Sequence, residues 1–303
     1  PPCGSRLSHQ ESQGGEQRFM IRKERVYILV KTYPAISKKY NELVCTAGIL
    51  ENGEWIRLYP IPFRILKEDQ KFPKFSWIEV EIERNTEDFR PETYRPNLNS
   101  ICVDPRPDKV DWKKRNDVIF KRTSVYRDLE KLLQDKSEKS ISLAIFKPKR
   151  ILDLVVKKTS REWDLQKLET LREKAAQLDL FMTPEEVQAE FSVVPKVPYE
   201  FSYKFEDEKG KISTLMISDW EIGMLYFNCL KWTNNDEPEA VKQVKTKYLD
   251  FFSTRDVYLF LGTTKGYHNI SDNPFIIIGV YYPPKAVEQD SPQLSLFDSE
   301  NGF

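Results

Sequence analysis

The chain has 303 residues, of which 40% are hydrophobic and 13% aromatic, and its formal net charge is zero. This length suffices for two domains that each bury a core, and the composition excludes the disordered and fibrous classes. Residues 20–160 carry 30 Lys and Arg against 21 Asp and Glu, whereas residues 161–303 carry 15 against 24. Opposite charge in the two halves indicates either contact of the basic half with a polyanion or a solvated surface whose signs happen to segregate.

The cysteine spacing and the hydropathy of the sequence indicate the cellular compartment. Cys3, Cys45, Cys102 and Cys229 lie far apart, without the spacing of a zinc site or a dense disulfide framework. No run of about 18 apolar residues and no signal segment stands in the sequence. We expect a cytoplasmic protein with no membrane insertion, no metal and no cofactor, whose residues 1–19 form a flexible tail.

The first expected elements are strands. Residues 26–32 and 43–50 read as strands, and the Asn-Gly at 52–53 supplies the two positive φ values of a type I′ turn before a returning strand at 54–59. Residues 75–84 alternate apolar and charged side chains, the pattern of a strand with one wet face. These strands predict a small barrel.

The remaining elements of the first expected domain, residues 20–158, follow in chain order. A helix is predicted at 125–134, with short strands at 142–146 and 151–156 that are interrupted by the basic run 147–150. Residues 159–194 are expected to form a helical connector, because their apolar residues recur at helical spacing.

The second expected domain spans residues 195–284. Its predicted elements are strands and helices at 198–206, 212–217, 219–232, 238–252, 257–261 and 275–282. Asp219 is the expected cap of the first of these helices. Residues 285–303 are polar, acidic and without periodicity, and are expected to form a flexible tail. The fold class is therefore α+β and β-rich, with two OB-like small barrels, decorating helices and a helical connector.

The sharpest motif lies in the expected C-terminal tail. It is the pentapeptide Gln293, Leu294, Ser295, Leu296 and Phe297. It resembles the peptide by which bacterial polymerases and repair proteins bind the sliding clamp. Leu296 and Phe297 suit an apolar pocket, and Gln293 suits the polar groups at its rim. The alternative is a tail whose apolar residues pack back on the fold.

A second copy of the motif stands at the end of the expected connector helix. Its residues are Gln177, Leu178, Asp179, Leu180 and Phe181. Chance would place one such match in roughly one chain in a thousand of this length. The alternative is that Leu178 and Phe181 continue the apolar face of the helix and belong to the core. If both copies bind, one chain occupies two of the repeated sites of the ring-shaped clamp, which raises its overall affinity.

Aromatic and basic residues alternate in the first half of the chain. Bases stack on aromatic rings while cations follow the phosphates, and OB barrels present such residues on their strands and loops. The alternative is core aromatics beside ordinary surface cations. The residues expected to touch nucleic acid are Lys31, Tyr33, Lys38, Lys39, Tyr40, Trp55, Arg57, Tyr59 and Arg64, with Arg90 and Arg95 on a proline-bounded loop that is otherwise a structural turn.

The segments 32–37, 42–48 and 55–61, together with 219–223, 260–263 and 274–280, resemble a bacterial family of dual OB-domain proteins. The resemblance covers roughly residues 20–284. It implies two OB-like barrels, a nucleic-acid context and association with genome-defence loci, and it implies no catalytic residue.

The sequence offers few candidate catalytic residues. His9 and His268 are the two histidines of the sequence, and the alternation of residues 79–83 directs Glu79, Glu81 and Glu83 to solvent. A meeting of Asp219, Glu221 and His268 is conceivable in the second domain, although Asp219 is explained as a cap. We expect no catalytic residue and no metal site.

Three functions follow from the sequence. The first is an accessory protein that binds nucleic acid and is recruited to the sliding clamp in replication, repair or phage defence. Its expected nucleic acid is DNA, with the single-stranded form preferred, or RNA. The alternatives are a metal-dependent nuclease and a protein-interaction scaffold or toxin-neutralising partner.

Overall fold

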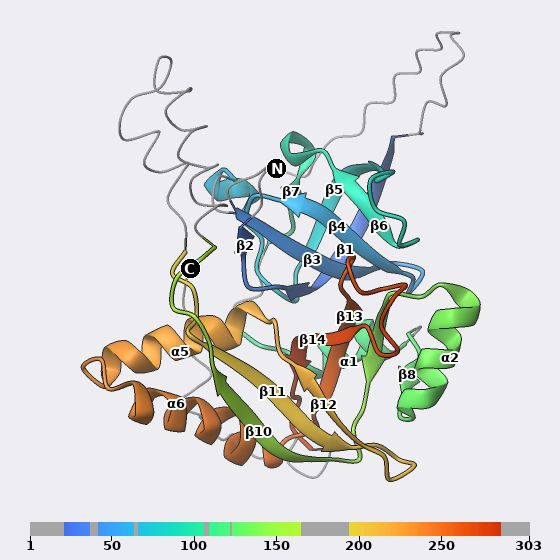
Figure 1. Cartoon of the computed structure of the whole chain (residues 1–303). Coiled ribbons are helices and arrows are strands. Elements are labelled where there is room, and N and C mark those ends of the chain that lie inside the picture. The colour runs from blue at the N-terminus through green and yellow to red at the C-terminus, as the bar shows by residue number, and fades with distance from the viewer. Residues whose placement is uncertain are drawn as a thin grey trace, which may run out of the picture.

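The structure is a computed structural model that describes residues 21–36, 42–63, 66–105, 109–121, 123–164 and 194–285. Its first half is a closed barrel, drawn blue to teal in Figure 1. The five strands that close it are β1 (Arg22–Lys31), β3 (Glu42–Leu50), β4 (Trp55–Ile61), β5 (Trp77–Arg84) and β6 (Thr93–Pro96). They pair in the ring β1-β3-β4-β6-β5-β1, with β4 and β6 parallel and the other pairs antiparallel. A five-stranded Greek-key ring is the OB architecture.

Local sequence explains the barrel strands. In the turn from β3 to β4, Gly53 has φ 89°, a value that costs glycine little, but Asn52 has no positive φ, so the predicted type I′ turn is wrong. The amide of Gly53 instead donates to the carbonyl oxygen of Leu50 at 2.9 Å, and the amide of Leu50 donates to the carbonyl oxygen of Glu54, which closes a longer loop.

On β5, Ile78, Val80 and Ile82 point into the barrel and are buried, while the residues between them are partly exposed. The alternation expected at residues 75–84 is therefore confirmed. The barrel also carries the short elements β2 (Ala35–Ile36), η2 (Glu68–Gln70), η3 (Leu98–Ser100) and β7 (Cys102–Val103).

The second half holds two sheets and most of the helices. A four-stranded sheet has the order β14-β13-β9-β8, and a three-stranded antiparallel sheet has the order β10-β11-β12. An isolated bridge between Ile217 and Ile277 joins them. The strands are β8 (Val125–Tyr126), β9 (Leu143–Phe146), β10 (Arg150–Lys158), β11 (Tyr199–Glu206), β12 (Ile212–Met216), β13 (Tyr258–Thr263) and β14 (Phe275–Tyr281). Within the described ranges, backbone pairing closes a ring in the first half and not in the second.

The helices pack around these sheets. They are α1 (Trp112–Phe120), α2 (Leu129–Lys139), α5 (Trp220–Trp232), α6 (Glu237–Lys245) and the π-helix η4 (Thr246–Phe251). Helices α5, α6 and η4 bury an apolar face against the three-stranded sheet, for example through Tyr226 and Tyr248. The carboxylate of Asp219 accepts the amide hydrogen of Glu221, so it caps α5 as expected. None of the helices among the described residues is long and apolar enough to cross a membrane.

The strand-rich α+β fold with an OB-like barrel and helices is confirmed. The pairing of β9 with β13 places residues 143–146, which are expected in the first domain, in the sheet of the second half. The expected connector lies mostly outside the described residues, as do the tails at residues 1–19 and 286–303.

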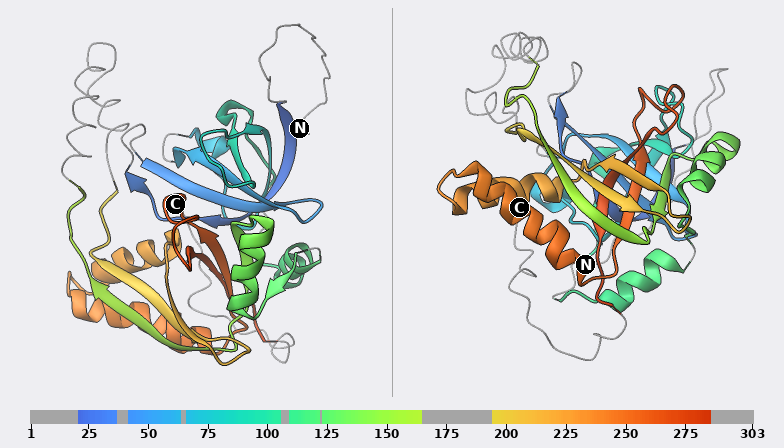
Figure 2. Two further views of the ribbon diagram at one scale, coloured as in Figure 1. Left: turned by 45° about the vertical axis from the view of Figure 1, so that its right-hand side comes forward. Right: turned by 60° about the horizontal axis from the view of Figure 1, so that its bottom comes forward.

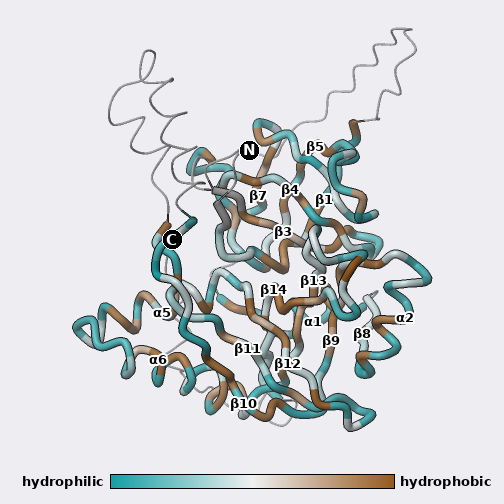
Figure 3. Tube along the Cα trace, viewed as in Figure 1, coloured by the Kyte–Doolittle hydropathy of each residue, from teal (hydrophilic) through white to brown (hydrophobic). Residues whose placement is uncertain are grey.

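The two halves share an apolar layer, which we call the seam. The outer faces of β1 and β3 contribute Tyr27, Leu29 and Ile49, and these pack against Phe260 of β13 and Tyr281 of β14. Figure 2 (left) shows β1 crossing the red strands β13 and β14. Figure 3 shows that β1 and these two strands are hydrophobic where they meet. The barrel face that OB proteins commonly leave open for ligands is therefore covered by protein.

Candidate nucleic-acid interface

The outer face of β4 carries three of the residues expected to touch nucleic acid. Trp55 packs edge-on against Phe260 of β13, with ring centroids 6.2 Å apart. Tyr59 is half-buried, and its carbonyl oxygen accepts a hydrogen bond from the side chain of Asn85 at 2.9 Å. Between them, Arg57 is 1% exposed. Trp55 therefore contacts the second half, whereas Tyr59 contacts Asn85 within the barrel.

The terminal nitrogens of the Arg57 guanidinium group are hydrogen-bonded to protein, whereas its buried Nε atom has no partner among the described residues. The guanidinium group donates to the hydroxyl groups of Thr93 at 3.1 Å and Ser142 at 2.7 Å, and to the carbonyl oxygen of Ser142 at 3.2 Å. Burial lowers the pKa of Arg57, because the charged form loses water. The prediction that Arg57 contacts nucleic acid is wrong, since a phosphate has no path to this group.

Lys31 and Tyr33 also serve packing. The ammonium group of Lys31 donates to the carbonyl oxygen of Phe72 at 3.2 Å and lies 4.2 Å from the ring centroid of Phe63, and the residue is buried. The hydroxyl group of Tyr33 donates to the carbonyl oxygen of Pro195 at 2.6 Å. Lys31 is therefore no surface cation, and Tyr33 ties the barrel to the second half.

The expected loop with Arg90 and Arg95 completes the barrel instead. Residues 93–96 form β6, which closes the ring between β4 and β5. Arg90 is buried, pairs with Asp88 and donates to the carbonyl oxygen of Thr263. Arg95 is 38% exposed and lies 3.8 Å from Glu83 and 3.5 Å from Glu87. Arg90 is thus another residue of the seam, and Arg95 is exposed but flanked by carboxylates.

The other residues predicted for the site lie outside the described part of the chain. These are Lys38, Lys39, Tyr40 and Arg64, the tail pentapeptide 293–297 and the internal pentapeptide 177–181.

The acidic residues considered for catalysis are not brought together with His268. Asp219 is fully buried and lies 3.5 Å from the ammonium group of Lys74, which also pairs with Glu221 at 2.7 Å. His268 lies at another place, where its Nδ1 is 2.8 Å from the hydroxyl group of Thr263. Within the described ranges, no three His, Cys, Asp or Glu residues group as metal ligands would.

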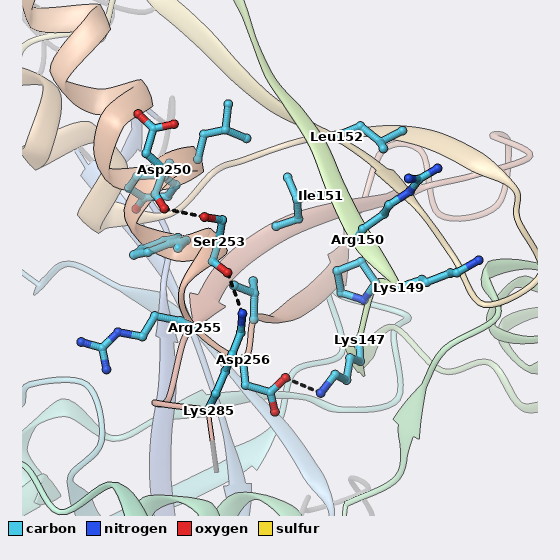
Figure 4. A pocket seen from close by; sticks show the side chains of 15 residues that line it. Lys147, Lys149, Arg150, Ile151, Leu152, Asp250, Ser253, Arg255, Asp256 and Lys285 are labelled. Carbon is cyan, nitrogen blue, oxygen red and sulfur yellow. Dashed lines mark hydrogen bonds and ion pairs between the residues drawn. The ribbon is translucent and has the colours of Figure 1, made fainter. Parts of the chain in front are cut away.

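A concentration of positive charge lies in the second half, in a cavity of about 480 Å³ that we call the basic pocket. The turn between β9 and β10 supplies Lys147, Lys149 and Arg150, and the opposite wall supplies Arg255 and Lys285. Figure 4 shows these side chains on the two walls, with Asp250 and Asp256 as the acidic residues of the lining.

The lysines and arginine of the β9–β10 turn are partly neutralised. Lys149 and Arg150 share one carboxylate, that of Glu206, and their hydrogen bonds lower its pKa. Lys147 pairs with Asp256 and lies 3.3 Å from the hydroxyl group of Tyr258. Because two cations share Glu206 and their side chains are 52% and 65% exposed, positive charge remains open to solvent here.

The cations of the opposite wall have no carboxylate partner among the described residues. Lys285 donates to the carbonyl oxygen of Ser253 at 2.9 Å. The guanidinium group of Arg255 lies 4.8 Å from the ring centroid of Phe251, and its buried Nε atom has no hydrogen-bond partner there. Both cations can therefore accept an anion without first breaking an ion pair.

The sequence carried one signal for this pocket, the basic run at residues 147–150. The two cations of the other wall lie about a hundred residues further along the chain, in a loop and after the last strand. Nothing local in the sequence joins them to the run, because the pairing of β9 with β13 is what brings the walls together.

Comparisons with known proteins give two family matches. The description "Domain of unknown function (DUF8758)" matches residues 22–121, and "Domain of unknown function (DUF8757)" matches residues 122–301. No curated protein matches the sequence. Among solved structures, a murine DNA-binding protein bound to double-stranded DNA aligns with 11% identity and a TM-score of 0.29, over 90% of this chain and 99% of that one. Because residues 122–301 are more than half of the chain, the protein belongs to the family described as Domain of unknown function (DUF8757).

Proposed function

We propose that this protein binds nucleic acid through the basic pocket and is recruited to a bacterial sliding clamp by residues 293–297. The observation that carries the first part is that five Lys and Arg side chains from distant segments line one cavity with two carboxylates. Lys and Arg are the side chains that bind phosphate, and release of counterions from nucleic acid favours such contacts.

The arrangement fits a backbone of phosphates better than a single small anion. Arg150 and Lys149 extend from one wall and Arg255 from the other (Figure 4). Cations at several places along the lining suit successive phosphates of an extended ligand.

The test measures the affinity for a fluorescently labelled single strand of DNA or RNA at several salt concentrations. The variant Lys149→Ala, Arg150→Ala, Arg255→Ala removes three cations from the pocket. We expect a loss of affinity of about tenfold or more, and a salt slope smaller by about 2, because each phosphate contact with a single strand contributes about 0.7.

The matched control is Lys23→Ala, Lys67→Ala, Lys231→Ala, which removes the same charge from exposed positions elsewhere. It should bind nearly as the unaltered protein does. Equal losses in the two variants would show that binding follows net charge alone, and would overturn the pocket as the site.

Recruitment to the clamp is supported by the two Gln-Leu-(Ser/Asp)-Leu-Phe pentapeptides in one chain. A peptide in a polar tail binds through a few buried anchors, here the side chains of Leu296 and Phe297. We expect purified clamp to retain the full chain and to lose it on Leu296→Ala with Phe297→Ala.

The control for the clamp experiment changes the same tail outside the pentapeptide, as Asp298→Ala with Phe303→Ala. The variant Leu180→Ala with Phe181→Ala tests the internal copy. Retention of the Leu296→Ala, Phe297→Ala variant at the level of the unaltered chain would refute docking by the tail.

A further inference from the structure

A second cavity, of about 510 Å³, opens where the barrel meets the second half, and we call it the aromatic cavity. We propose that it holds a nucleobase with an exocyclic amino group, taken from a single strand. The inference deepens the proposed function and rests on it, because the base would belong to the bound strand. Cavities of this size between two structural units are common ligand sites.

Three aromatic rings from both halves line the cavity. Trp55 comes from the start of β4, Tyr94 from β6 and Tyr126 from β8. All three side chains are partly exposed, whereas Phe260 and Tyr281 of the seam are buried. A flat heterocycle can stack on such rings, and stacking contributes a large share of binding to single strands.

Each ring is held in place by a neighbouring side chain, and one of these, Arg22, itself lines the cavity. Trp55 packs on Phe260, and the hydroxyl group of Tyr126 donates to the carboxylate of Asp135 at 2.9 Å. The guanidinium group of Arg22 lies 5.0 Å from the ring centroid of Tyr94. The rings therefore need little reordering when a ligand enters, which favours affinity.

Two carboxylates give the cavity its selectivity. The oxygens of Glu92 accept hydrogen bonds from the amide and the hydroxyl group of Ser142, each at 2.7 Å, so the carboxylate is fixed and each oxygen keeps a lone pair. Glu54 is exposed at the cavity and has no ion pair or side-chain hydrogen bond among the described residues.

Ionised carboxylates accept hydrogen bonds and cannot donate them. Cytosine, adenine and guanine offer amino hydrogens to such acceptors, whereas thymine and uracil offer carbonyl oxygens at the equivalent positions. The cavity should therefore prefer cytosine to thymine, two pyrimidines of similar size.

The experiment compares the affinity for oligo(dC) and oligo(dT) strands of about ten nucleotides at one salt concentration, a length within the usual site size of such proteins. We expect oligo(dC) to bind about tenfold more tightly. Glu54→Ala should reduce that preference, and Tyr94→Leu should lower the affinity for both strands. The control Tyr267→Leu removes an aromatic ring that is 62% exposed outside the cavity, and should change neither.

Melting temperatures of all variants show whether each is folded, and Glu54→Ala, at an exposed side chain that pairs with none of the described residues, should match the unaltered protein. Equal affinity for the two strands, or a preference that survives both cavity variants, would overturn the inference while leaving salt-dependent binding intact. If neither strand binds, the proposed function fails. Titration with free deoxycytidine and thymidine then tests, without any strand, whether the cavity binds a nucleobase. Binding of deoxycytidine that Tyr94→Leu abolishes would support it, and no binding would overturn it.

Discussion

The guanidinium group of Arg57 donates to the hydroxyl group of Ser142 at 2.7 Å, which joins the outer face of β4 to the residue before β9. The same hydroxyl group donates to Glu92 at 2.7 Å. Arg57, Ser142 and Glu92 thus form a chain of hydrogen bonds between the two halves, in which Arg57 and Ser142 are buried and Glu92 is part-buried. Buried networks of this kind favour one relative placement of the parts they join, since any shift leaves polar groups without partners.

Replacing Arg57 should destabilise the fold. In Arg57→Met the side chains of Thr93 and Ser142 lose a charged donor in a dry environment, and we expect a loss of about 2–3 kcal/mol in the free energy of unfolding. Urea denaturation measures it. The control is Arg127→Ala, whose guanidinium group is 50% exposed beside Glu208 and should change the stability by less than about 1 kcal/mol. Equal effects of the two substitutions would contradict a role for the network.

Gly223 allows α5 to approach Tyr33. A Cβ atom on this residue would lie 2.3 Å from Cδ2 of Tyr33, whose hydroxyl group is tied to Pro195. Gly223→Ala should therefore cost about 1–3 kcal/mol, although alanine favours a helix by up to about 1 kcal/mol. With Tyr33→Ala in the background, the same change should cost less or stabilise the protein. An identical cost in both backgrounds, measured by urea denaturation, would exclude the contact as its cause.

His268 should make the stability fall in mild acid. Burial lowers the pKa of His268 from 6.5, and Lys136 and Arg90 lower it further. The unfolded chain then binds the proton more tightly than the folded one, so stability present above pH 6.5 is lost as the pH falls below it. In His268→Gln the urea concentration at the unfolding midpoint should change less between about pH 7.5 and about pH 5.5 than in the unaltered protein. Parallel curves for the two proteins would show that His268 does not contribute.

Asp135 should act at lower pH. Hydrogen bonds from Lys131, then Tyr126 and Lys139, lower its pKa from 3.8 to about 2. A lowered carboxyl pKa stabilises the fold above the unfolded value and loses that effect as the pH falls from about 4 towards about 2. The difference in melting temperature between the unaltered protein and Asp135→Asn should therefore shrink with acid. Glu138→Gln, on the same helix, is the control and should show no such change.

The elements of the fold follow from short stretches of sequence. The position of the turn at residues 52–53, the alternation of Ile78, Val80 and Ile82 and the cap at Asp219 each depend on a few residues of the chain. Local interactions of this kind can be predicted without knowing what lies across the molecule.

The covering of β4 depends on partners far along the chain. Arg57 and Ser142 are 85 residues apart, and an alternation of rings and cations is equally typical of a ligand face and of a polar contact between two units. One signal did exist. Residues 26–30 of β1 are an uninterrupted apolar run, and all are buried, which is the pattern of a strand covered on both faces.

The seam bears on how the two matched regions can be separated. A fragment cut between residues 121 and 122 would keep the whole barrel but expose Tyr27, Leu29 and Ile49 to water, on strands that are otherwise paired. An exposed apolar surface of this kind associates with the same surface on other molecules. We expect the fragment to aggregate, and the complete protein to melt in a single calorimetric transition, because the seam makes the two family regions one cooperative unit.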